Sequence, residues 1–183
     1  QVRYLIERQA QQCLWTINGQ MAGEHFIEQQ FANIADNQHP VGLLKDVCQG
    51  RTAVLLAGGP SLDDMLDWVI AHREQLLVVA VSRIATRCRQ VRLTPDIIVA
   101  IDPTDKMFAV SHDMLAFADT SVFISADHVT ALLGSAWPGA HCYAGSRYPW
   151  RLQEDDNVPA QGPTVTNMAI ACLCHMGCSR IFL

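Results

Sequence analysis

Residues 57–62, Ala-Gly-Gly-Pro-Ser-Leu, have the composition of a loop that could bind a phosphate group. The apolar residues before them, Val54 to Ala57, are typical of a buried strand in a parallel sheet. Gly58 and Gly59 would let the backbone approach a ligand with no Cβ in the way. Free N–H groups at the start of a following helix attract phosphate oxygens. The spacing therefore predicts a phosphate-binding turn at the carboxyl end of a strand.

The helix after this turn is predicted to begin at Pro60 and Ser61. Proline suits the first turn because its missing N–H would have no partner there, and the Ser61 hydroxyl can cap the helix. Asp63 and Asp64 follow where the helix dipole favours negative charge. The turn lacks the third glycine of the dinucleotide fingerprint and the Gly-Lys-Ser/Thr of a Walker A loop, so neither label applies. The alternative interpretation is an ordinary strand-to-helix turn.

A second glycine precedes another predicted helix in the segment Gly162-Pro163-Thr164. Backbone N–H groups there, with the hydroxyls of Thr164 and Thr166, could form a second surface for oxygen atoms of a ligand. The alternative is that Thr164 simply caps the helix and Asn167 faces solvent or a neighbouring loop.

The chain has 183 residues, enough for one domain with a helical appendage, and half of them are hydrophobic. A formal net charge of −5 argues against a nucleic-acid partner, although four arginines cluster locally: Arg83, Arg87, Arg89 and Arg92. A small anionic ligand remains compatible with this charge. No apolar run approaches the roughly 20 residues that span a bilayer, and residues 1–12 are too polar for a signal peptide. We expect a cytoplasmic protein without a membrane span.

Seven cysteines are present, but their odd number and scattered spacing fit neither a disulfide framework nor a zinc site. Cys172, Cys174 and Cys178 lie in or just after an apolar helical pattern, so we expect reduced, buried thiols and no metal.

Apolar runs that alternate with helical patterns indicate an α/β fold. Residues 2–35 are predicted to form one or two helices that pack outside the sheet, as part of an N-terminal helical segment over 1–44. Strands are predicted at 54–57, 76–81, 97–101, 121–125, 141–144 and 180–183, and helices at 62–74, 84–91, 114–118, 129–133 and 164–176. Continuous apolar strands of this kind predict a mostly parallel sheet in a three-layer Rossmann-like α/β/α sandwich over residues 45–183.

Three predicted strands end on polar residues: the first at Gly58–Ser61, the second at Ser82 and Arg83, and the third at Asp102. In parallel sheets, ligands bind beyond the carboxyl ends of the strands. We therefore expect these three loops to converge on one crevice.

The order of these motifs resembles that of the MptE-like family. The resemblance rests on residues 57–62, Val-Ala-Val-Ser at 79–82, Thr-Pro-Asp-Ile-Ile-Val-Ala-Ile-Asp at 94–102, and Gly-Pro-Thr-Val at 162–165 with the final Met-Gly-Cys-Ser-Arg-Ile-Phe-Leu. The family includes bacterial motility accessory factors, which are similar to glycosyltransferases that attach nonulosonic (sialic-like) sugars to flagellin. It also includes archaeal 6-hydroxymethyl-7,8-dihydropterin diphosphokinases, and its core is similar to a bacterial sialyltransferase fold.

The chain departs from the family pattern in three places. The first glycine of the pair at Gly58 is displaced, Pro163-Thr164-Val165 replaces a small Ser-Val step, and the sequence stops at Leu183 before the Gly-x-Asp turn of the family. The nucleotide-binding domain is therefore expected to be truncated at its C-terminus.

The resemblance implies a nucleotide-dependent glycosyltransferase with a CMP-activated nonulosonic sugar as donor and flagellin or a related protein as acceptor. The donor phosphate would contact the turn formed by Gly58, Gly59, Pro60 and Ser61. Ser82 and Asp102 would contact the nucleotide or sugar, and Gly162, Thr164 and Asn167 would close the opposite side.

Transfer to a hydroxyl requires a group that takes its proton, and His128 or His141, in predicted late loops, could serve. The alternative for each is a solvated surface histidine.

A second hypothesis is a diphosphokinase that uses ATP and Mg²⁺, with Asp102 as a metal ligand. Asp102 and Asp105 could instead be turn-forming residues beside Pro103. A third hypothesis is a non-catalytic nucleotide-sugar-binding domain.

Overall fold

The structure is a computed structural model that describes residues 23–145, 157–160 and 164–183. Within these residues, six parallel strands form one sheet in the order β5-β4-β3-β2-β1-β6. The strands are β1 (Thr52–Leu56), β2 (Leu76–Val81), β3 (Ile97–Ala100), β4 (Val122–Ala126), β5 (His141–Ala144) and β6 (Arg180–Phe182). All six predicted strands are therefore confirmed.

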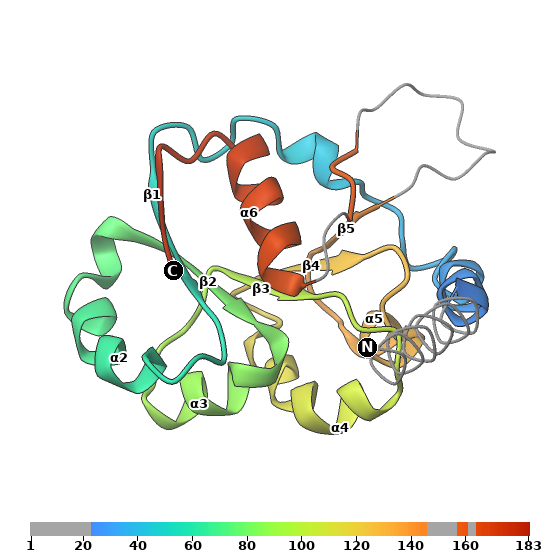
Figure 1. The fold of residues 1–183 in the computed structure, drawn as a ribbon, viewed down its shortest axis with the longest axis horizontal. Helices are drawn as coiled ribbons and strands as arrows, with labels where there is room; N and C mark the ends of the chain where they lie inside the picture. Colours follow the sequence, from blue (N-terminus) through green and yellow to red (C-terminus); the bar gives the residue numbers. More distant parts are fainter. Residues whose placement is uncertain (1–22, 146–156, 161–163) are drawn as a thin grey trace, which may run out of the picture.

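Helices cover both faces of this sheet. Figure 1 shows α6 on one face and α2, α3 and α4 on the other, so the predicted three-layer sandwich is confirmed. The labelled α-helices are α2 (Leu62–Ala71), α3 (Ala85–Gln90), α4 (Lys106–Ser111), α5 (Ala131–Ala136) and α6 (Val165–His175). Short 3₁₀ helices are η1 (Val41–Leu44), η2 (Arg73–Gln75), η3 (Ser82–Ile84) and η4 (His112–Phe117).

The apolar runs of the sequence become the centre of the sheet. All six residues of β2 are buried, as are all four of β3. Both strands lie between other strands and under helices on either face, which explains why their sequences are continuously apolar instead of alternating. The edge strand β6 differs, because Phe182 is exposed and Ile181 is half-buried.

Two predictions about helices and cysteines are wrong in detail. Most of the segment predicted as a helix at 114–118 belongs to the 3₁₀ helix η4, which ends at Phe117. The preceding helix α4 was not predicted, because Val110 is exposed and blurs its amphipathic pattern. Cys174 is exposed whereas Cys172 is buried. Positions two apart on a helix face different directions, so the two thiols cannot share one buried face.

The described part of the N-terminal segment is hydrogen bonded to the sheet. A helix over residues 23–32 leads to Asn33, whose side-chain amide donates to the carbonyls of Asp127 and Val129 at 3.2 and 2.6 Å. Further along, Pro40 forms an isolated parallel bridge with Tyr143 of β5. These contacts fix the segment beside β4 and β5. In the part of the chain that the structure describes, no helix is long and apolar enough to cross a membrane.

Candidate functional site

The connectivity of the sheet places a crevice between β1 and β6. The chain leaves β1 through α2 on one face, and it reaches β6, the other neighbour of β1, through α6 on the opposite face. The helical connections of these two neighbouring strands therefore lie on opposite faces of the sheet, which makes the position between β1 and β6 a topological switch point. In open α/β sheets, ligands bind at such a point, beyond the carboxyl ends of the strands. The turn at Gly58 and the first turn of α6 both lie at this edge.

A cavity of about 360 Å³ lies beside this point, at the carboxyl ends of β2 and β3. Its polar lining comes from three separate segments: Ser82 and Arg83 after β2, Asp102 after β3, and Thr164 and Thr166 at the start of α6. Three of the predicted site residues, Ser82, Asp102 and Thr164, therefore line one cavity. We call this cavity the anion crevice. Gly162 lies outside the described residues.

Arg83 lies directly over the glycine turn. A Cβ built on Gly58 would be 2.9 Å from Nη2 and 3.0 Å from Nε of Arg83, so the guanidinium occupies the space that the missing side chain leaves. Arg83 makes no hydrogen bond or ion pair with any described residue, in contrast to Arg87, which pairs with Asp63 at 2.7 Å. A solvent-facing guanidinium without a protein partner is suited to bidentate binding of a phosphate or carboxylate.

The two helices that begin at the crevice are capped differently. Ser61 makes no side-chain capping bond to α2, so the predicted Ser61 cap is wrong, although the helix begins at Leu62, the first residue of the predicted range 62–74. Thr164 does cap α6: its hydroxyl oxygen accepts from the Asn167 N–H at 3.4 Å and donates to the Asn167 side-chain oxygen at 2.5 Å. This geometry matches the alternative interpretation, in which Thr164 caps the helix. The Asn167 side chain is hydrogen bonded to Thr164 within the first helix turn.

The other predicted polar residues have internal partners. Ser82 is buried and its hydroxyl accepts from the Ser111 hydroxyl at 3.0 Å. One Asp102 oxygen accepts from the Thr104 backbone N–H at 2.8 Å and from its hydroxyl at 2.6 Å. That is a turn-forming aspartate, as the alternative interpretation held. The second oxygen of Asp102 has no hydrogen bond with the described residues.

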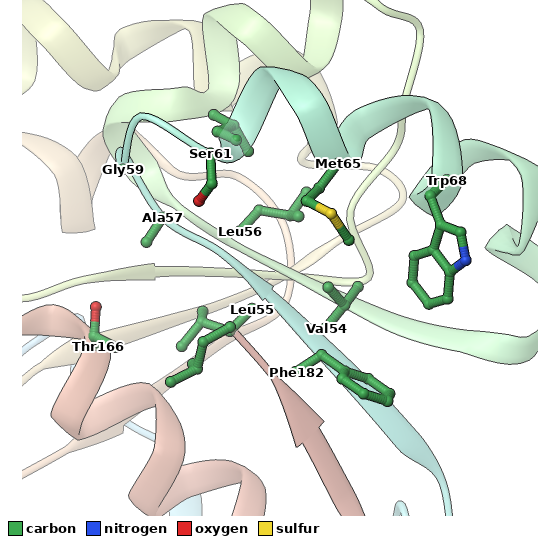
Figure 2. Close-up of a pocket in the computed structure, with 12 residues that line it drawn as sticks. Val54, Leu55, Leu56, Ala57, Gly59, Ser61, Met65, Trp68, Thr166 and Phe182 are labelled. Carbon is green, nitrogen blue, oxygen red and sulfur yellow. The ribbon is translucent and has the colours of Figure 1, made fainter.

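An apolar groove of about 310 Å³ continues from the crevice on the side of β6. Figure 2 shows Ser61 and Thr166 near one end of it, and Met65, Trp68 and Phe182 toward the other. Trp68 and Phe182 contact each other with ring centroids 6.2 Å apart. Because Thr166 lines both spaces, a ligand with an anionic group in the crevice can extend an apolar or planar group into the groove.

The two predicted catalytic histidines lie at different ends of the sheet. His128 follows β4 at its carboxyl end, and its Nδ1 is 2.8 Å from the Asp127 carboxylate. His141 is the first residue of β5, as the predicted strand over 141–144 has it, so only its description as a loop residue among the candidate bases is wrong. It stacks on Phe123, and burial lowers its pKa to about 4, which keeps it neutral at pH 7. The structure does not bring His141 to the crevice.

Sequence reasoning placed Arg83 at the expected crevice but did not name it as a site residue. Of the residues that line the groove, it named Gly59 and Ser61 but not Met65, Trp68 or Phe182. The position of Arg83, directly after a buried strand whose end faces the expected crevice, was a usable signal. Met65 and Trp68 lie three residues apart on α2, which is also the spacing of ordinary core positions, so the sequence could not separate the two uses.

Comparisons with known proteins agree with this architecture. The family model described as 6-hydroxymethylpterin diphosphokinase MptE-like matches residues 28–183. A solved structure, the MAf glycosyltransferase from Magnetospirillum magneticum AMB-1, matches with a TM-score of 0.70 at 15% sequence identity. The match covers 86% of this chain and 26% of that one, so this chain spans about a quarter of that protein. No curated protein matches the sequence. The structural match reflects a shared fold, and the family match over most of the sequence means that the chain belongs to the MptE-like family.

Proposed function

We propose that this chain is the nucleotide-binding part of a transferase that moves a sugar from a CMP-activated nonulosonic donor to a hydroxyl of flagellin or a related protein. The observation that carries the proposal is Arg83, a guanidinium without a protein partner among the described residues, held over Gly58 at the anion crevice. The names of the family and of the similar structure, a diphosphokinase and a glycosyltransferase, both describe transferases.

The crevice suits a phosphate that leaves with negative charge. When the bond between the sugar and the donor phosphate breaks, both electrons remain on the phosphate oxygen. Arg83 and the first backbone N–H groups of α6 would stabilise that charge. The apolar groove beside Thr166 would hold the nucleoside, with Met65 and Trp68 against its planar base. In this proposal the reaction takes place in the cytoplasm.

A diphosphokinase would instead need Mg²⁺ beside the phosphates. Among the described residues that line the crevice, Asp102 supplies the carboxylate, and one of its oxygens already accepts from Thr104. Mg²⁺ bound by one carboxylate and substrate phosphates is compatible with this donor set. Asp102 would hold the ion, which would neutralise charge on the phosphates.

Calorimetric titration of the purified protein with CMP, CMP-sialic acid, ATP and ATP with Mg²⁺ tests the proposal. We expect CMP and CMP-sialic acid to bind in the presence of EDTA, and Arg83→Gln to abolish most of this binding. The matched control is Arg92→Gln, which removes the same charge from the loop before β3, at the amino end of the sheet. Binding of ATP alone, and only with Mg²⁺, would instead identify a diphosphokinase. Donor binding without turnover in the full-length protein would indicate a non-catalytic binding domain.

A further inference from the structure

The loop after β4 carries a histidine that is paired with a buried carboxylate. His128 Nδ1 lies 2.8 Å from one oxygen of Asp127, whose side chain is 4% exposed. The other oxygen of Asp127 accepts from the side-chain amide of Gln30 at 3.0 Å. One carboxylate therefore orients the imidazole and also binds the helix over residues 23–32.

This pairing determines which nitrogen of His128 is basic. A carboxylate only accepts hydrogen bonds, so the 2.8 Å contact requires the proton of a neutral imidazole on Nδ1. The lone pair is then on Nε2, which has no hydrogen bond with the described residues. The edge-to-face contact with Phe26, with centroids 4.4 Å apart and planes at 86°, fixes the orientation of the ring.

The corner is shaped around the carboxylate. Gly145, at the end of β5, has φ of +135°, and a Cβ built on it would lie 2.2 Å from Cγ of Asp127. Any side chain at this position would displace the carboxylate. The ends of β4 and β5 thus leave room for the Asp127 carboxylate, a charged group that packing of an apolar core would not require.

This corner adjoins the anion crevice. The Thr130 N–H donates to the carbonyl of Asp102 at 3.0 Å, and Nε2 of His25 is 3.0 Å from the carbonyl of Pro103. The loop that carries His128 and the helix that carries Phe26 are therefore both hydrogen bonded to the loop of Asp102, which lines the crevice.

We propose that His128 is the general base of the transfer reaction and that Asp127 is its positioning residue, an inference that rests on the proposed function. Nε2 of His128 takes the proton of the acceptor hydroxyl while that oxygen forms a bond to the anomeric carbon of the donor. The bond from this carbon to the phosphate oxygen breaks, and its electron pair leaves with the phosphate toward Arg83. Asp127 stabilises the imidazolium until His128 releases the proton to solvent.

Turnover of CMP-sialic acid by the full-length protein, followed as CMP release with water or an added acceptor, tests the base. We expect His128→Gln to lower kcat about 100-fold or more while the Kd for CMP changes less than twofold. Asp127→Asn is expected to lower kcat at least about 10-fold, also without loss of CMP binding, because an amide can donate to Nδ1 and reverse the tautomer. His112→Gln, an exposed histidine that contacts the Ala109 carbonyl, is the control and is expected to match the wild-type protein.

Nitrogen NMR of the histidine rings provides a readout that needs no substrate. We expect His128 to carry its proton on Nδ1 in the wild-type protein and on Nε2 in Asp127→Asn, a change that a purely structural role would not require. A wild-type proton on Nε2 overturns the inference whether or not nucleotide binds. Turnover by His128→Gln within threefold of wild type overturns it while the proposed function stands, whereas absence of CMP binding by the wild-type protein refutes the proposed function itself.

Discussion

Two helices begin at the same edge of the sheet, and their first turns are chemically opposite. α2 follows the glycine turn, carries Asp63 and Asp64 in its first turn and has no side-chain cap. α6 carries no acidic residue in its first turn and is capped by Thr164. The turn that most resembles a phosphate-binding motif therefore leads into the helix whose N-terminus is already neutralised by its own carboxylates.

We infer from this difference that charge, and not glycine content, identifies the side that would favour an anion. A carboxylate in the first turn of a helix gains about 0.3–1 kcal/mol from the dipole. That carboxylate would repel a phosphate bound at the same helix end. At α6 the N-terminal N–H groups have no such competitor, and Arg83 faces the same cavity. We therefore expect the phosphate to lie between Arg83 and α6, with Gly58 serving to make room for the guanidinium.

Removal of the Arg83 charge is expected to have the largest effect. A charge-assisted hydrogen bond is worth about 1.5–3 kcal/mol, so Arg83→Gln should weaken CMP binding about 10- to 100-fold. The free energy of unfolding should stay nearly unchanged because the side chain has no partner among the described residues. Calorimetry and urea unfolding measure the two quantities. Unchanged affinity would show that Arg83 does not contact the phosphate.

The two glycines of the turn are expected to respond differently to alanine. A Cβ on Gly58 would collide with the guanidinium, which is the flexible end of its side chain, whereas a Cβ on Gly59 would meet only the Ser61 hydroxyl at 4.0 Å. Neither glycine has a positive φ, so neither substitution strains the backbone. Gly58→Ala should therefore fold normally and bind CMP about fivefold more weakly, a loss of about 1 kcal/mol. If Gly59→Ala lost as much CMP affinity as Gly58→Ala, the ligand would contact the turn itself.

The fold could be read from the sequence because its central strands are buried on both faces. Continuous apolar runs such as residues 76–81 allow few alternatives, and the predicted range coincides with β2. The short connections were harder to predict: residues 106–117 form an α-helix followed by a 3₁₀ helix, and neither has a clear amphipathic repeat.

The site was only partly predictable, for a different reason. Strand ends marked where Ser82 and Asp102 would meet, because parallel topology alone fixes that edge, whereas Thr164 was placed opposite them only by the family resemblance. The direction of each side chain depends on contacts between distant segments. Ser82 bonds to Ser111, and the guanidinium of Arg83 reaches back over Gly58, neither of which a local pattern encodes.

The capping difference itself can be measured as stability. Loss of an N-cap side chain costs about 1 kcal/mol, so Thr164→Ala should lower the free energy of unfolding by about that amount. Ser61→Ala should change it by no more than a few tenths of a kcal/mol, because the Ser61 hydroxyl makes no capping bond. Urea unfolding of both variants tests this pair. Equal destabilisation would mean that the two helix starts are not capped differently.

Exchange of a single charge between the two helix starts is expected to have the smallest effect and to give the sharpest test of the comparison. Asp64→Asn removes a carboxylate from the first turn of α2, and Asn167→Asp adds one to the first turn of α6 at the position that Thr164 already contacts. Interactions of this kind are worth about 0.3–1 kcal/mol, so Asn167→Asp should weaken CMP binding about two- to fivefold while α6 keeps its cap. If the phosphate lies beside α6, Asp64→Asn should strengthen CMP binding by a smaller factor than Asn167→Asp weakens it, because the Asp64 carboxylate is farther from the phosphate.

Calorimetry at low ionic strength, where such charges are least screened, measures both changes. A larger gain from Asp64→Asn than loss from Asn167→Asp would place the phosphate at α2 and reverse the assignment of the two helices.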